Sequence, residues 1–205
     1  MNNYAYIIAS LPVLCGDFRA GCGPDAEQVL EEIREQLSEK DLKTLDFFLS
    51  GFEADNLDAG FYRKALSHGN RFVRGYFTFD LCVRNAKAEF LNRAFGRPDG
   101  NDVVCTEEDG DPIEFDEAAE LEKVLGLEDI LAREKALDAL MWDKAVELAI
   151  FDYFDMETVL SFVARLKIAD RWMKLDEAAG REMFRRIVEE VRGTFKGVES
   201  IEKEK

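Results

Sequence analysis

The stretch that decides the fold is EKALDALMWDKAVELAIFDYFDMETVLSFVARLKIADRW, residues 134–172. Apolar residues recur in it at intervals of three and four, which places a wide apolar stripe on one face of a helix. The pattern predicts two amphipathic helices that meet at an aromatic corner, Phe151–Asp155, and form a helical hairpin. The residues expected on the buried faces are Leu137, Leu140, Met141, Val146, Leu148 and Ile150, then Val159, Phe162, Val163, Leu166, Ile168 and Trp172.

Outward from this hairpin, the helical period continues through most of the chain. Helices are expected at 4–11, from Pro24 to 37, from Ser38 to 52, at 70–95, near 116–125 and at 176–195. The period stops between 97 and 116, where Gly, Pro and Asp dominate and predict an acidic loop. We therefore expect an all-α fold of six to eight helices in one domain, 1–205. Subdivision into 1–96 and 117–198, joined by loop 97–116, is the alternative.

The most regular pattern lies between Asn70 and Phe95. Its apolar residues are spaced 4, 3, 4, 3 and 4 apart: Phe72, Tyr76, Phe79, Val83, Ala86 and Phe90. This is a heptad-like seam, and Gly96 with Pro98 predicts its end. The same helix carries five basic residues, Arg71, Arg74, Arg84, Lys87 and Arg93. They are either ordinary solvated charges or a docking face for an acidic partner, and spacing alone does not choose between these readings.

The charge is large and uneven. The 205 residues carry a net charge of −16, which argues against binding nucleic acid, because phosphate backbones require clustered basic residues. Residues 60–96 hold seven basic and two acidic groups, whereas residues 97–162 hold five and 20. Such polarity suits docking against partners of opposite charge. There is no apolar run of about 18 residues that could cross a bilayer and no secretory signal, so a cytoplasmic protein is expected.

No residue pattern indicates catalysis, a metal or a cofactor. The cysteines at 15, 22, 82 and 105 form no Cys-x-x-Cys pair, so free thiols are expected. The glycine-bearing loop 15–23 matches no phosphate-binding motif, and the acidic loop fails the calcium-loop register at Cys105. His68, the only histidine, is expected at the surface near a helix start. Asp152 and Asp155 are expected to cap helices rather than act as an acid–base pair.

Three segments carry a resemblance to a known family: YAYIIASLP from residue 4, GYFTFDLCVRNAKAEFLNRAFG from residue 75, and DALMWDKAVELAIFDYFDMETVLSFVARLKIADRW from residue 138. Together they resemble bacterial proteins of about 200 residues and unassigned function that are encoded with the components of V/A-type rotary ATPases. The chain is similar, more distantly, to the C-type component of those enzymes (type d in eukaryotes), the all-helical socket between rotor shaft and membrane ring. Two segments, 76–80 and 153–157, are interpreted as similar corners of repeated helical units.

This resemblance implies a non-catalytic subunit or accessory factor of a V/A-type ATPase. Its partners would be the central stalk and the membrane ring, with no nucleic acid bound and only peripheral contact with the membrane, at its inner face. The five basic residues of 70–95 are then the expected partner interface. Two alternatives stay open: an assembly chaperone of that complex, and a small-molecule enzyme that uses paired carboxylates in a deep pocket.

Overall fold

The computed structural model describes residues 4–16, 23–104, 115–175, 182 and 185–186. In these residues the fold is all-α, as the sequence predicts, with eight α-helices, one 3₁₀ turn and no strand. The helices are α1 (Tyr4–Ser10), α2 (Ala26–Arg34), α3 (Glu39–Ser50), α4 (Ala59–Leu66), α5 (Arg71–Phe95), α6 (Ala118–Leu125), α7 (Ile130–Leu148) and α8 (Met156–Met173), with the 3₁₀ turn η1 (Ala54–Asn56) after α3. Of the helix expected at 176–195, the structure describes only residues 182, 185 and 186, which are helical.

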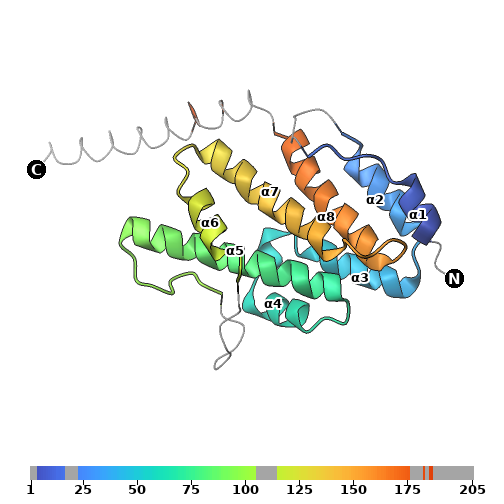
Figure 1. The fold of residues 1–205 in the computed structure, drawn as a ribbon, viewed down its shortest axis with the longest axis horizontal. Coiled ribbons are helices and arrows are strands. Elements are labelled where there is room, and N and C mark those ends of the chain that lie inside the picture. The colour runs from blue at the N-terminus through green and yellow to red at the C-terminus, as the bar shows by residue number, and fades with distance from the viewer. Residues whose placement is uncertain (1–3, 17–22, 105–114, 176–181, 183–184, 187–205) are drawn as a thin grey trace, which may run out of the picture.

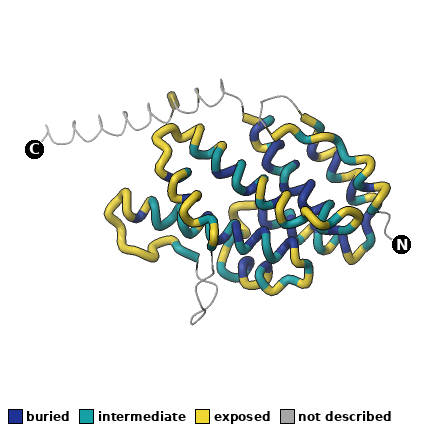
Figure 2. Tube along the Cα trace, viewed as in Figure 1, coloured by how far each residue is buried: buried dark blue, intermediate teal, exposed yellow. Residues whose placement is uncertain are grey.

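The α7–α8 hairpin and the long helix α5 form the centre of the bundle (Figure 1). Helix α5 crosses the hairpin and contacts α4, α6, α7 and α8, while α1, α2 and α3 pack on α8. Helices on both sides of the 97–116 segment therefore contribute to one hydrophobic core. Figure 2 shows that buried residues follow the inward sides of the helices, whereas the C-terminal end of α5 is exposed.

Helix α5 begins and ends where the sequence predicts. The Asn70 side chain accepts hydrogen bonds from the backbone N–H groups of Phe72 and Val73, at 2.9 and 3.1 Å. At the other end Gly96 adopts the left-handed conformation, with φ of 62°, which glycine reaches without a steric cost. The first four residues of the heptad-like seam are buried and the last two are half-buried. This seam is the main packing face of the bundle.

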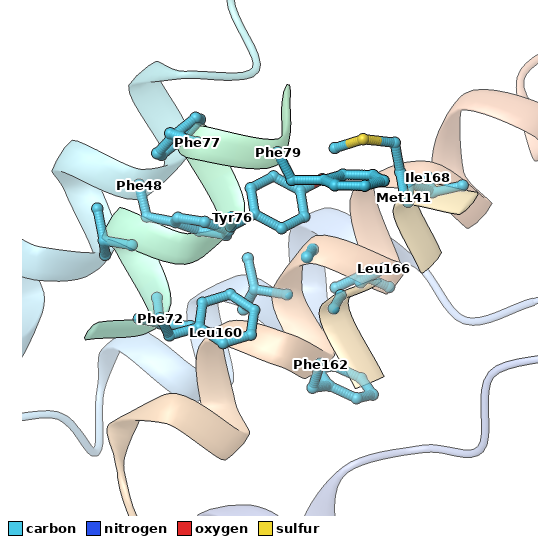
Figure 3. Close-up of a cluster of buried hydrophobic side chains, with 14 of the residues drawn as sticks. Phe48, Phe72, Tyr76, Phe77, Phe79, Met141, Leu160, Phe162, Leu166 and Ile168 are labelled. Carbon is cyan, nitrogen blue, oxygen red and sulfur yellow. The ribbon is translucent and has the colours of Figure 1, made fainter. Parts of the chain in front are cut away.

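The core is rich in aromatic rings (Figure 3). Phe48 of α3 is fully buried, and its ring lies 5.2 to 5.7 Å from those of Phe72, Tyr76 and Phe77 on α5. Most of these contacts are edge-to-face or tilted, the arrangement that the charge distribution of aromatic rings favours. The predicted seam of α5 is thus joined to α3 by ring packing.

Three expectations about the core are wrong. The segment 76–80 is not a corner: it lies in the middle of α5, where the backbone hydrogen-bond ladder continues without a turn. Only the Phe151–Asp155 corner exists as predicted, between α7 and α8. Val146 and Ile150, expected on the buried face, are 40% and 57% exposed, because α7 ends at Leu148 and this side of its last turn faces away from α8.

Helix α4 was not expected from the sequence. Asp58 starts it, since its carboxylate accepts a hydrogen bond from the N–H of Phe61 at 2.7 Å. Phe61, Tyr62 and Ala65 bury its short apolar face against α5. The helix-start signal is present, but eight residues give too short a pattern to reveal a period.

Candidate functional site

A groove between α5 and α7 gathers charged side chains from four parts of the fold. Its volume is about 490 Å³, and it is lined by α5, α7, the segment after α5 and the end of α8. Four basic and four acidic residues face it: Arg84, Lys87, Arg97 and Arg171, and Asp80, Asp102, Glu134 and Asp138. In a chain of net charge −16, this groove is locally balanced.

At one wall, Asp80 of α5 joins a tyrosine to an arginine. The Tyr62 hydroxyl donates to Asp80 Oδ2 at 2.6 Å, and Arg84 Nε donates to the same oxygen at 2.8 Å. Burial, and then the Asp80 carboxylate, raise the pKa of Tyr62, so its hydroxyl stays protonated and acts as a donor. Burial opposes the charge of Arg84, but Asp80 outweighs it and raises the pKa of the guanidinium. The ion pair between Asp80 and Arg84 lies within α5, and the hydrogen bond from Tyr62 ties α4 to it.

The opposite wall is organised by Asp138 of α7. Its Oδ2 accepts a hydrogen bond from Trp172 Nε1 at 2.5 Å and pairs with the Arg171 guanidinium. Burial raises the pKa of the Asp138 carboxyl, although Arg171 and Trp172 favour its charged form. Desolvation is therefore stronger than the stabilisation by the two partners. The cluster joins α7 to the last turn of α8.

The two remaining cations are also paired. Lys87 Nζ lies 3.3 Å from Glu134 Oε1, which links α5 to α7, and Arg97 lies 3.7 Å from Asp102. Every basic residue that lines the groove thus has a carboxylate partner. Asp80 and Asp138 are each held by two donors of the chain. We conclude that this arrangement of paired charges links the helices that line the groove.

The Asp138 cluster predicts a pH dependence of stability. The pKa of Asp138 is higher in the folded protein than in the unfolded chain, so the native state favours the protonated carboxyl. The contribution of this carboxyl to stability is therefore full below its pKa in the unfolded chain. It is lost as the pH rises through its pKa in the folded protein. We expect the free energy of unfolding of the wild type, minus that of Asp138→Asn, to increase as pH falls from 7 toward 4. Urea unfolding at several pH values measures this difference.

A matched variant, Asp143→Asn, removes an exposed carboxylate from the same helix and controls for the loss of one negative charge. A wild-type minus Asp138→Asn difference that decreases as pH falls would contradict the assignment, because it would mean that the pair with Arg171 outweighs burial.

The five basic residues of α5 do not form one face. Arg71 pairs with Asp152, and Arg74 donates to the backbone oxygens of His68 and Gly69 at 2.5 and 3.1 Å. Arg84 and Lys87 lie in the groove, whereas Arg93 lines a separate cavity between α5 and α6. Residues 71 and 93 are about 33 Å apart along the helix axis. The structure therefore brings together only Arg84 and Lys87.

The separate cavity has a volume of about 460 Å³ and an apolar floor. Ala86 of α5, Phe115, and Leu121 and Leu125 of α6 line it, with Arg93 and three carboxylates, Glu89, Asp99 and Glu122, around them. Helix α6 is fixed next to it by Lys144 of α7, whose Nζ lies 2.6 Å from Glu117.

The single histidine has a structural role and is more buried than expected. The His68 ring stacks on Phe47, with 5.1 Å between ring centroids, and its Nδ1 accepts a hydrogen bond from the N–H of Asn70. Burial lowers the pKa of His68, which keeps the ring neutral and able to accept that bond. His68 thereby shapes the turn between α4 and α5.

Within the described part of the chain, no group of three or more His, Cys, Asp or Glu residues is placed to hold a metal ion. Cys15 and Cys82 are free thiols there, and burial raises the pKa of Cys82. Cys22, Cys105, most of the loop 15–23 and the rejected calcium loop lie outside the described residues. Among the described helices, none is both long enough and apolar enough to span a bilayer.

A family model described as a protein of unknown function, DUF2764, matches residues 53–194. No curated protein and no solved structure is significantly similar to the chain.

Proposed function

We propose that this chain, which belongs to the DUF2764 family, is a non-catalytic subunit or accessory factor of a V/A-type rotary ATPase. In this role it couples the soluble central rotor to the membrane ring. Its partners are the central-stalk and ring proteins, and it reaches the inner face of the membrane only through them. The link to the ATPase rests on the resemblance of three segments, from residues 4, 75 and 138, to proteins encoded with ATPase components.

The observation that supports a non-catalytic role is the pairing of charges in the groove between α5 and α7. All four of its basic residues contact carboxylates, and its central acids Asp80 and Asp138 are each held by two donors. A catalytic pocket exposes at least one group to its substrate, whereas paired charges between helices maintain a shape. An all-helical body of fixed shape suits a part that transmits force between two larger assemblies.

The test is a tagged pull-down from gently solubilised native membranes, with the proteins identified by mass spectrometry at low and moderate salt. We expect rotary ATPase subunits in a fixed ratio to the bait. Capture of no ATPase component at low salt would contradict the proposal. Purification of a fully active ATPase that lacks the protein would favour the assembly chaperone over a permanent subunit.

The structure also changes which charge variants are informative. Reversal of Arg71, Arg74 and Arg84 to Glu would break contacts with Asp152, with the α4–α5 turn and with Asp80, respectively. A loss of association in that triple variant would then reflect altered packing as much as a lost docking face. Arg93→Glu at the exposed end of α5 tests the basic interface with less disturbance of the fold.

A further inference from the structure

The turn between α7 and α8 exposes four large apolar side chains in five residues. Ile150 is 57% exposed, Phe151 86%, Tyr153 70% and Phe154 66%. We call residues 150–155 the aromatic turn. Exposed apolar residues are common singly, but contiguous aromatic clusters mark interaction sites in proteins. Aromatic residues are also the side chains that contribute most to binding energy at protein interfaces.

The two carboxylates of the aromatic turn point back into the protein. Asp152 pairs with Arg71 of α5, and its side chain is only 11% exposed. Asp155 caps α8 by accepting hydrogen bonds from the N–H and the hydroxyl of Thr158, at 3.0 and 3.1 Å. A backbone hydrogen bond from the N–H of Asp152 to the carbonyl oxygen of Ala149, at 3.0 Å, also closes the turn. The polar groups thus hold the turn in place while the rings face outward, an arrangement that lowers the entropy cost of binding.

The size of the cluster matches a protein partner. Aromatic side chains bury 150–250 Å² each, so these four residues expose roughly 500–600 Å² of mainly apolar surface. One side of a standard protein–protein interface is about 800 Å². The aromatic turn supplies most of such a surface, and Val146, 40% exposed on the last turns of α7, extends it.

The charge around the cluster is negative. Residues 143–157 contain five carboxylates and one lysine, Lys144, and Arg71 of α5 adds a second cation where it pairs with Asp152. Asp143 lies three residues before Val146, and Glu147 lies three residues before Ile150, so both exposed carboxylates border the apolar surface. Lys144 lies between two carboxylates, those of Glu117 and Glu147, and does not reverse this sign. A complementary surface is apolar at its centre and basic at its border.

Two other kinds of partner, a second copy of the chain and a membrane surface, fit the aromatic turn less well. Two copies that met through their aromatic turns would bring the exposed carboxylates of Asp143 and Glu147 of one copy close to those of the other, and like charges at an interface repel. An anionic membrane surface would repel a chain of net charge −16. A different protein with a concave apolar surface remains.

We infer that the aromatic turn is the contact through which this chain docks into an apolar groove, bordered by Lys and Arg, on a partner protein. The inference rests on the proposed function, which makes that partner a subunit of the rotary ATPase. The acidic border sets the orientation of the complex, and the rings provide the binding energy.

The test compares two double variants of the full-length tagged chain in the membrane pull-down. Phe151→Ser with Phe154→Ser removes the rings from the aromatic turn. Ile130→Ser with Leu131→Ser is the matched control, because these residues are 66% and 56% exposed at the other end of α7, about 30 Å away. We expect the first variant to recover at least tenfold less ATPase than wild type, and the control to recover as much. Both should melt within a few degrees of wild type.

The outcomes separate the two proposals. If wild type captures ATPase subunits and the Phe151/Phe154 variant captures them equally, the docking inference is wrong and the proposed function stands. If wild type captures no ATPase component, the proposed function is wrong and the inference fails with it.

A photo-reactive amino acid in place of Tyr153 identifies the molecule that contacts the aromatic turn. Crosslinks to one protein of the ATPase support the inference, whereas crosslinks mainly to lipid or to a second copy overturn it.

Discussion

Replacing Phe48 with alanine is expected to lower the free energy of unfolding by about 3–5 kcal/mol. Phe48 is fully buried and packs against three rings of α5 and against Phe52. Those neighbours belong to different turns of α3 and α5, so they cannot all move into the space that the ring leaves. The loss therefore includes both the transfer of the ring to water and the cavity. For a chain of this size the melting temperature should fall by roughly 6–20 °C.

Phe151→Ala is the matched control for this variant. It makes the same chemical change at a ring that is 86% exposed, so its stability should lie within about 0.5 kcal/mol of wild type. Chemical denaturation of the three proteins measures both effects. A Phe48→Ala variant as stable as Phe151→Ala would mean that Phe48 does not sit at the centre of the core.

The second large effect is expected at Gly51, where α3 ends against α4 and α5. A Cβ atom placed there would lie 2.7 Å from Cζ of Phe61 and would overlap the ring of Phe77. The backbone itself accepts any residue, with φ of −77°, so the requirement for glycine is steric. Since rigid rings on two helices would have to move, Gly51→Ala should destabilise the protein by about 2–3 kcal/mol.

Gly69→Ala provides the comparison, because nothing lies within 4 Å of a Cβ atom at that position. Alanine there reduces the freedom of the unfolded chain and should leave stability unchanged or raise it by up to about 1 kcal/mol. Equal melting temperatures for Gly51→Ala and Gly69→Ala would mean that the rings of Phe61 and Phe77 pack less closely around Gly51 than the structure shows.

Much of this fold follows from local sequence signals. The regular spacing from Phe72 to Phe90, the Asn70 cap and Gly96 define α5 without any tertiary information. Ser38 and Asp41 form the expected cap of α3, with the Ser38 hydroxyl donating to the Asp41 carboxylate at 2.7 Å. In such places backbone groups are satisfied by residues two to four positions away, so the sequence alone is sufficient.

The groove could not be predicted in this way. Tyr62 and Asp80 are 18 residues apart, and Asp138 and Trp172 are 34 apart, so their hydrogen bonds depend on how the helices cross. Reading 76–80 as a corner failed for a related reason: its aromatic and acidic composition resembles that of 153–157, but its residues continue the heptad spacing of α5. For this segment the spacing of the apolar residues predicts the helix correctly, whereas the composition does not. At the aromatic turn the corner was predicted, whereas its exposure follows from the inward pairing of Asp152 and Asp155.

The packing of α1 on α8 also determines when the chain can complete its fold during synthesis. Ile7 of α1 is fully buried, and α1, α2 and α3 all contact α8, which ends at Met173. At typical rates of about 5–20 residues per second, a ribosome needs roughly 8–35 s to reach the end of α8 after it has made α1. During that interval the apolar faces that α1 and α2 pack on α8 lack this partner, whereas α3 can already pack on α5 through Phe48. Holding chaperones are therefore expected to bind the nascent chain until α8 emerges.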